Sequence, residues 1–210
     1  VGASLKQIAD EEQLSDFSVS KDEWSTIRVL GKGAGSFAAP TADLDCGNSG
    51  TTARLLTGVL SACPFASTLI GDHSLSQRPF RRVTEPLSRM GAKFSGEKLP
   101  LTINGGALKG IEFFSPQASA QVKSAILLAG LLAEGPVVVT EPRLSRDHTE
   151  RMLISMGCAV ESTQLPDGRW RIALPNTPGR ARLKAQAITI PGDFSAAAFF
   201  LVAGSIFPGS

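Results

Sequence analysis

Three apolar helices with small polar residues at their starts recur along the chain. Each predicted helix follows a turn of glycine, serine or aspartate, continues as a run of apolar residues, and contains a glycine near its end. The glycines, at positions 58, 130 and 204, follow one another at intervals of 72 and 74 residues, which indicates an internal repeat. The three predicted helical segments are Gly47–Leu60, Ser119–Leu132 and Asp193–Ile206.

A second pair of helices also repeats. These helices end at Met90-Gly91 and Met156-Gly157, and glycine is the usual residue just past the last turn of a helix. Short stretches rich in β-branched and aromatic residues lie between the helices and predict strands. The predicted strands are Ala66–Ile70, Lys93-Phe94, Leu101–Ile103, Ile111–Phe114, Val137–Thr140, Ala159-Val160, Trp170–Leu174 and Ala187–Ile190.

The order of these elements predicts the fold class. Each unit is strand–helix–strand–helix–strand–strand over about 65–75 residues, which is too long for a solenoid repeat. Parallel strands joined by helices indicate an α/β fold with helices packed on sheets. The chain starts at Val1-Gly2-Ala3, which resembles a helix end, and its last predicted helix opens a unit that is not completed. We therefore expect a piece of a longer protein, with an incomplete repeat domain at 1–190 and the start of a return into a second domain at 191–210.

Composition excludes several classes of protein. The chain has 210 residues, of which 42% are hydrophobic, and no apolar run approaches the ~18 residues that span a bilayer. A net charge of +2 is too small to indicate a nucleic-acid or membrane partner. The three cysteines lack metal-ligand spacing and only two histidines are present, so we expect no metal site. Free thiols in a reducing cytoplasm are the expected state of Cys46, Cys63 and Cys158.

The most informative stretch is Gly47–Arg54, a glycine-rich turn directly before an apolar helix. Such a turn leaves backbone N–H groups unpaired at the positive end of the helix dipole, where anions bind. The hydroxyls of Ser49, Thr51 and Thr52 and the guanidinium of Arg54 add further donors. The turn predicts a phosphate or carboxylate site, and an ordinary N-cap is the alternative interpretation.

Three other helix starts carry candidate polar groups. Arg78 precedes Pro79, a residue suited to the first position of a helix, so an anion there would relieve repulsion from the dipole. A solvated surface arginine is the alternative. Ser119 and Gln121 open the second repeat helix, in the place that the glycine turn occupies in the first, and simple capping is the alternative. His148 opens a later helix, either as a general base or, as we favour, as a hydrogen-bonding group.

Four motifs occur in a characteristic order: Leu44–Arg54, Gly71–Arg82, Ser119–Gly130 and Pro191–Ala197. Together they resemble the 5-enolpyruvylshikimate-3-phosphate synthase (3-phosphoshikimate 1-carboxyvinyltransferase) family, from about residue 40 onwards. The resemblance implies repeated βαβαββ units packed around a helical core, in two domains with an active site in the cleft between them. It also implies enolpyruvyl transfer from phosphoenolpyruvate to the 5-hydroxyl of shikimate 3-phosphate in chorismate biosynthesis, with no metal or organic cofactor.

The resemblance also implies roles for particular residues. The phosphoenolpyruvate-binding residues would be Gly50, Arg78 and Gln121. The shikimate 3-phosphate-binding residues would be Thr51, Ser119, Ala120, Gln121, Ser145 and His148. Asn48 and Arg54 would brace the turn, and His148 stands where some members have an aromatic residue.

The remaining functional residues of the family would lie outside this chain. Its Lys-Ser-Arg phosphate cluster would precede Val1, and its acid–base aspartate and glutamate would follow Ser210. No residue here is assigned a catalytic role, so we expect substrate binding without turnover. The expected partners are the two substrates and the remainder of the same enzyme.

Other functions remain as alternatives. A UDP-N-acetylglucosamine enolpyruvyl transferase would carry a reactive cysteine after a Pro-Gly-Gly turn, a setting that none of the three cysteines has. An RNA terminal-phosphate cyclase would be more basic, and a non-catalytic substrate-binding half is the third alternative. The family is the target of glyphosate; Ser119–Lys123 and Arg146–Glu150 resemble the tolerant bacterial class, whereas unsubstituted Gly50 and His73 depart from it.

Overall fold

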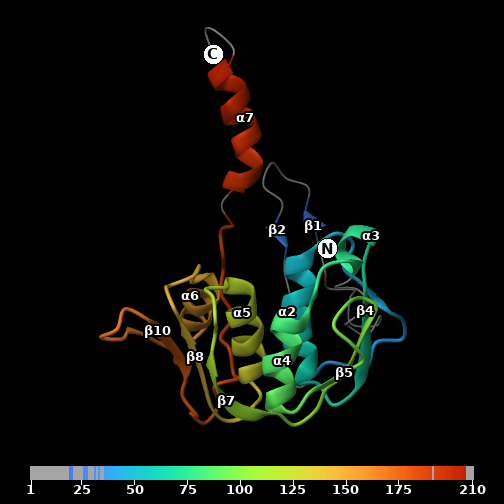
Figure 1. Cartoon of the computed structure of the whole chain (residues 1–210), viewed down its shortest axis with the longest axis vertical. Coiled ribbons are helices and arrows are strands. Elements are labelled where there is room, and N and C mark those ends of the chain that lie inside the picture. The colour runs from blue at the N-terminus through green and yellow to red at the C-terminus, as the bar shows by residue number, and fades with distance from the viewer. Residues whose placement is uncertain are drawn as a thin grey trace.

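Two four-stranded sheets flank a central layer of helices in the computed structural model (Figure 1). The structure describes residues 19–20, 26–27, 31, 33, 36–190 and 192–206. Near the start of the described residues, β1 (Val19–Ser20) and β2 (Thr26–Ile27) form a short antiparallel pair. The beginning of the chain, where we expected a helix end, lies outside the described residues.

The first sheet has the strand order β3-β4-β6-β5. Its first two strands are parallel and are joined by a helical crossover, whereas the other neighbours pair antiparallel. The strands are β3 (Leu44–Asp45), β4 (Ala66–Ile70), β5 (Lys93–Phe94) and β6 (Leu101–Asn104). The helices of this unit are α2 (Gly50–Ser61), α3 (His73–Ser76) and α4 (Arg81–Met90).

The second sheet repeats this connectivity in the order β7-β8-β10-β9, again with a parallel first pair and antiparallel neighbours after it. Its strands are β7 (Lys109–Phe114), β8 (Glu134–Glu141), β9 (Glu161–Gln164) and β10 (Trp170–Leu174). Its helices are α5 (Ala120–Gly130) and α6 (His148–Ser155). Two consecutive βαβαββ units confirm the expected fold class and the internal repeat.

Each sheet is mixed. Its first pair of strands is parallel and joined by a helical crossover, as expected, whereas its last two strands follow one another without a crossover and pair antiparallel. Two expectations about the strands were wrong. The strand expected at Ala159-Val160 begins later, at Glu161. The stretch Ala187–Ile190 forms no strand, because these exposed residues have no ladder partner in the described part of the chain.

The helices α2 and α5 pack against each other in the central layer (Figure 1). They approach so closely that a Cβ atom on Gly58 would overlap the backbone of Ala125. Ser49 caps the start of α2 and Ser119 caps the start of α5, each by accepting a backbone N–H with its side-chain oxygen. The close packing brings these two helix starts, which belong to different units, next to each other.

Each sheet covers its own part of the apolar core. Residues such as Leu69 and Leu101 pack under the first sheet, and Ile126 and Ile172 pack under the second. The helix α7 (Phe194–Ile206) projects away from this body, and Phe199 and Phe200 on it are 80% and 81% exposed. Among the described residues, no helix combines the length and apolar character needed to cross a membrane.

Candidate anion-binding site

The glycine turn before α2 is tied to the loop that follows β4. Gly47 has a φ of +53°, in the left-handed region that favours glycine, and its N–H donates to Asp45 Oδ1 at 2.8 Å. The carbonyl of Gly47 accepts the N–H of Asp72 at 2.9 Å. Ser49 Oγ accepts the N–H of Thr52 at 3.1 Å. Together with the bonds from the N–H groups of Gly50 and Ala53 to the carbonyls of Asn48 and Ser49, they fix the start of α2.

Two arginines lie beside Gly50. An ideal Cβ at this position would stand 2.6 Å from Arg54 Nη1 and 3.2 Å from Arg78 Nη1, so the bare glycine leaves the guanidiniums room. Burial lowers the pKa of Arg54, and the charges of Arg78 and Arg82 lower it further. Arg54 also lies 5.1 Å from the centre of the Phe80 ring. Positive charge is thus concentrated where an anion would meet the helix start.

Arg78 is positioned by its polar neighbours. Its Nη2 donates to Asn48 Oδ1 at 3.4 Å, and Asn48 Nδ2 donates to Asp72 Oδ2 at 2.5 Å. Asp72 also caps α3 by accepting the N–H of Leu75. The hydrogen bond from Asn48 lowers the pKa of Asp72 most, followed by the Leu75 N–H, and the Arg78 charge adds to the effect. As expected, Asn48 braces the turn.

The expected position of Pro79 at the start of a helix was wrong. Phe80 is the N-cap of α4, because its carbonyl accepts the N–H groups of Val83 and Thr84 at 2.8 and 3.0 Å. Arg78 therefore lies in the connection between α3 and α4. It reaches Gly50 from there, rather than from the first turn of a helix.

Gln121 links the two repeat units. Its Nε2 donates to Thr51 Oγ1 at 2.7 Å, while its Oε1 accepts from Arg54 Nη1 at 3.3 Å. Arg54 also donates to the carbonyls of Gly50 and Pro79, which agrees with its expected bracing role. The turn before α2 and the start of α5 are consequently parts of one continuous polar surface.

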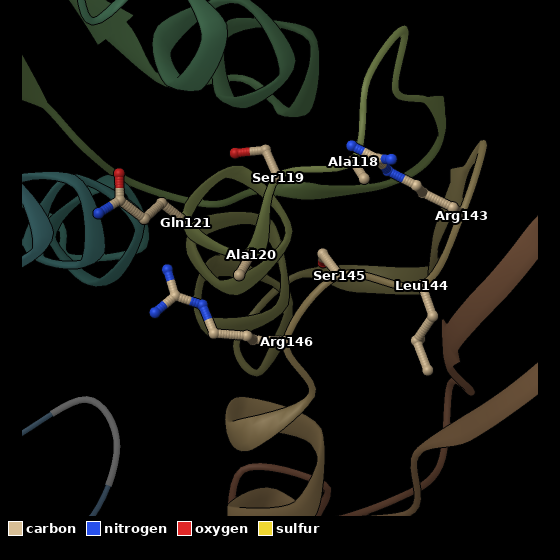
Figure 2. Close-up of a pocket in the computed structure, with 8 residues that line it drawn as sticks. All are labelled: Ala118, Ser119, Ala120, Gln121, Arg143, Leu144, Ser145 and Arg146. Atoms are coloured by element: carbon tan, nitrogen blue, oxygen red, sulfur yellow. The ribbon is translucent and has the colours of Figure 1, made fainter. Parts of the chain in front are cut away.

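A pocket of about 440 Å³ opens at the start of α5 (Figure 2). One side is the first turn of this helix and the other is the loop between β8 and α6. A helix N-terminus, serine hydroxyls and two arginines here provide donors and positive charge for an anion. The lining residues are Ala118, Ser119, Ala120, Gln121, Arg143, Leu144, Ser145 and Arg146.

The structure brings most of the expected binding residues together. Four line the pocket: Ser119, Ala120, Gln121 and Ser145. Gly50, Thr51 and Arg78 gather at the adjacent turn, to which Gln121 connects them. His148 is exposed at the first residue of α6 and is not part of the pocket lining.

Arg143 and Arg146 are site residues that the sequence analysis did not assign. Both lie on the loop after β8 and line the pocket with exposed side chains. They belong to no periodic pattern; the available signal was two arginines on a short loop between a predicted strand and a predicted helix.

Neither a reactive thiol nor a metal cluster accompanies this site. Burial, and secondarily the charge of Asp45, raise the pKa of the Cys46 thiol to about 11, so this thiol is protonated near neutral pH. All three cysteines are buried and free. Across the described ranges, no group of three or more histidine, cysteine, aspartate or glutamate side chains is arranged to hold a metal ion.

Comparison with known proteins adds to this geometry. The model of the EPSP synthase (3-phosphoshikimate 1-carboxyvinyltransferase) family matches residues 12–210, beginning well before the motifs. The 3-phosphoshikimate 1-carboxyvinyltransferase of Bacillus licheniformis is 51% identical over 190 residues, which are 89% of this chain and 42% of the relative. That of Citrifermentans bemidjiense is 53% identical over 193 residues, or 90% and 43% of the two chains.

A solved structure supports the same assignment. The 2.37 Å structure of EPSP synthase from Acinetobacter baumannii aligns with a TM-score of 0.73 and 44% identity, over 93% of this chain and 44% of that chain. The chain thus spans less than half the length of these relatives. Sequence, topology and fold agree, and the chain belongs to the EPSP synthase family.

Proposed function

We propose that this chain carries one half of the site at which enolpyruvyl is transferred from phosphoenolpyruvate to the 5-hydroxyl of shikimate 3-phosphate, with release of phosphate. The observation that carries the proposal is the bridging of two adjacent cationic helix starts by Gln121. Both substrates are anions, so their union requires two donor-rich sites side by side. Family membership, and the pocket at the start of α5 beside the arginine-lined turn, support this function over a simple helix cap.

Phosphoenolpyruvate would occupy the turn before α2. The Arg78 guanidinium offers a planar pair of donors that matches a carboxylate or phosphate group. The absence of a side chain at Gly50 lets the ligand approach the helix N-terminus. Gln121 would contact the same ligand from the side of α5.

Shikimate 3-phosphate would occupy the pocket at the start of α5. Ser119, the backbone of Ala120 and Gln121 would bind it from the helix, and Thr51 lies within hydrogen-bonding distance of Gln121. The proposed binding set is completed by Ser145 on the facing loop and by His148 at the start of α6. Arg143 and Arg146 bring positive charge to the wall opposite the helix.

The chemical step needs groups that we place in the remainder of the enzyme. The 5-hydroxyl oxygen adds to C2 of phosphoenolpyruvate as the hydroxyl gives up its proton and C3 gains one; the tetrahedral intermediate then loses phosphate from C2 and a proton from C3. This chain would hold the substrates in register and stabilise developing charge.

We assign residues 1–190 to the incomplete repeat domain and 191–210 to the return into the second domain, whose apolar residues would cover α7. The buried free thiols favour a reducing cytoplasm as the location.

Calorimetric titration tests this proposal. Shikimate 3-phosphate is titrated into the chain first, and phosphoenolpyruvate then into the mixture, with UDP-N-acetylglucosamine as the competing substrate. We expect binding of the first two ligands, no binding of the sugar nucleotide and no phosphate release. Absence of binding by shikimate 3-phosphate refutes the proposal, and preferential binding of the sugar nucleotide favours the sister enzyme.

A pair of charge-matched variants assigns the phosphoenolpyruvate site. Arg78→Met removes the guanidinium beside Gly50, and we expect it to weaken phosphoenolpyruvate binding at least about tenfold. Arg81→Met removes an equal charge three residues away, from an exposed side chain paired with Glu97. Equal losses in both variants would indicate a general charge effect and would contradict a specific role for Arg78.

A further inference from the structure

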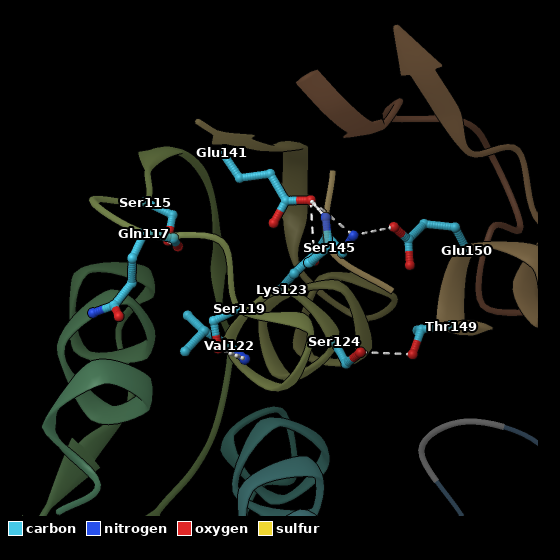
Figure 3. Close-up of polar contacts among 10 residues, drawn as sticks. All are labelled: Ser115, Gln117, Ser119, Val122, Lys123, Ser124, Glu141, Ser145, Thr149 and Glu150. Carbon is cyan, nitrogen blue, oxygen red and sulfur yellow. Dashed lines mark hydrogen bonds and ion pairs between the residues drawn. The ribbon is translucent and has the colours of Figure 1, made fainter. Parts of the chain in front are cut away.

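Three charged side chains are buried behind the pocket at the start of α5. Lys123 on α5 and Glu141 at the end of β8 each have 1% of the side chain exposed, and Glu150 on α6 has 4%. Lys123 Nζ lies 3.0 Å from Glu141 Oε1 and 2.6 Å from Glu150 Oε1 (Figure 3). Burying charges is costly, and a second carboxylate exceeds what one ammonium group needs. The extra carboxylate therefore calls for another role.

Glu141 has such a role in the loop that follows it. Its Oε1 accepts the backbone N–H of Ser145 at 2.8 Å and the hydroxyl of Ser145 at 3.0 Å (Figure 3). Ser145 lies between Arg143 and Arg146, and all three residues line the pocket. The end of β8 thus fastens its own following loop, while Lys123 fixes the carboxylate.

The two hydrogen bonds from Ser145 to Glu141 differ in whether they can persist when a ligand binds. A serine hydroxyl has one proton, so while it donates to Glu141 it has none to give to a bound phosphate. The backbone N–H is under no such demand and can stay with Glu141 when the hydroxyl turns towards a ligand. The N–H bond is therefore the contact that can hold the loop with the pocket occupied.

We propose that Glu141 is a positioning residue for the anion pocket. Held by Lys123, it fixes the Arg143–Arg146 loop through the Ser145 N–H, so that both guanidiniums face the phosphate of shikimate 3-phosphate. The ligand in this statement rests on the proposed function. The anchoring of the loop stands on the geometry of the ligand-free chain.

Two substitutions at one position separate charge from hydrogen bonding. Glu141→Gln and Glu141→Met both leave Lys123 matched one-to-one with Glu150, so they alter the buried charge equally. Gln keeps an oxygen that can accept the Ser145 N–H, whereas Met has no such acceptor. Glu134→Gln, at the exposed opposite end of β8, is the control. A difference between the first two variants reports the hydrogen bond itself.

The experiment uses the full 210-residue chain and two measurements. Amide hydrogen exchange of Ser145 is followed without ligand, and the dissociation constant for shikimate 3-phosphate is measured by calorimetry. In Glu141→Met we expect Ser145 exchange to accelerate, and binding to weaken, each about tenfold or more. Glu141→Gln should retain most of both properties, and Glu134→Gln should match the wild type.

Unchanged Ser145 exchange in Glu141→Met overturns the positioning role, as do equal affinities of the Gln and Met variants. If Glu141→Met does not fold, Glu141→Asp replaces it, because Asp keeps the charge but withdraws the acceptor by one methylene. It should then show the faster exchange and weaker binding. Failure of the wild type to bind shikimate 3-phosphate refutes the proposed function, whereas the exchange comparison still decides whether Glu141 anchors the loop.

Discussion

Replacing Gly58 by alanine tests whether the contact between α2 and α5 holds the two repeat units in register. An ideal Cβ on Gly58 would stand 2.8 Å from both the Cα and the carbonyl carbon of Ala125, and closer still to its carbonyl oxygen. Ordinary van der Waals contact begins at 3.4 Å, so the helices must separate by at least about half an ångström. The obstacle is backbone, which cannot rotate away as a side chain can.

The expected magnitude follows from two opposing effects. Overpacking of this kind costs about 1–3 kcal/mol or more. Alanine is favoured over glycine inside a helix by about 1 kcal/mol, which offsets part of that cost. Because the obstacle is backbone, we take the upper end of the overpacking range, about 3 kcal/mol, and expect a net loss of about 2 kcal/mol in the free energy of unfolding. The separation would also lengthen the 2.7 Å bond between Gln121 and Thr51, so shikimate 3-phosphate should bind more weakly.

Urea unfolding followed by circular dichroism measures the stability change. Gly106→Ala is the matched control, because its Cβ would meet no atom within 4 Å and its φ lies outside the left-handed region. This control should be neutral or slightly stabilising. A Gly58→Ala variant as stable as the control would refute the idea that backbone contact at this position fixes the helix pair.

Three further predictions concern single side chains. Arg180 is buried and donates to the carbonyls of Leu131, Ala133 and Gly135. Arg180→Met should lower the free energy of unfolding in urea by about 1–3 kcal/mol, because these acceptors lose their donor; an unaltered midpoint would contradict this. Cys46, with a pKa raised to about 11, should react with iodoacetamide at pH 8 far more slowly in the folded chain than in urea, and equal rates would show that the thiol is not protected. The folded-state pKa of Asp72 lies below its ordinary 3.8, so its stabilising contribution is present above pH 3.8 and is lost as the pH falls through the folded value. Asp72→Asn should therefore reduce stability at pH 6 and approach the wild type as the pH falls below the folded-state pKa, as urea midpoints across this range would show; a difference independent of pH would exclude this linkage.

The repeat and most elements were predictable from the sequence because they depend on local patterns. Apolar runs after small polar turns specify α2 and α5, and glycine after Met90 and Met156 marks the ends of a second pair of helical segments. Ala187–Ile190 has the composition of a strand, but a strand also needs a partner, and composition does not supply one. The prediction that Pro79 begins a helix was wrong for a similar reason: the first turn of α4 depends on which N–H groups the Phe80 carbonyl accepts.

The parts of the candidate site that lie within sequence motifs were predictable. The turn around Gly50 and the start of α5 carry recognisable residues, and the structure places them side by side. No binding role was predicted for Arg143 and Arg146, because loop residues follow no periodicity. No local pattern indicates the burial of Lys123, since it depends on carboxylates from β8 and α6 that are distant in sequence. Such pairings arise only in the folded chain.

Gln121 has a consequence for the affinity of a second ligand at the proposed site. Its amide is already committed on both sides, donating to Thr51 and accepting from Arg54. A ligand in the pocket at the start of α5 that recruits this amide would release Thr51 or Arg54 on α2, and so would change the free energy available to a second ligand at the turn before α2. By reciprocity, each ligand must alter the affinity of the other by the same factor. Under the proposed function, one side chain would make the two neighbouring anion sites a thermodynamically linked pair.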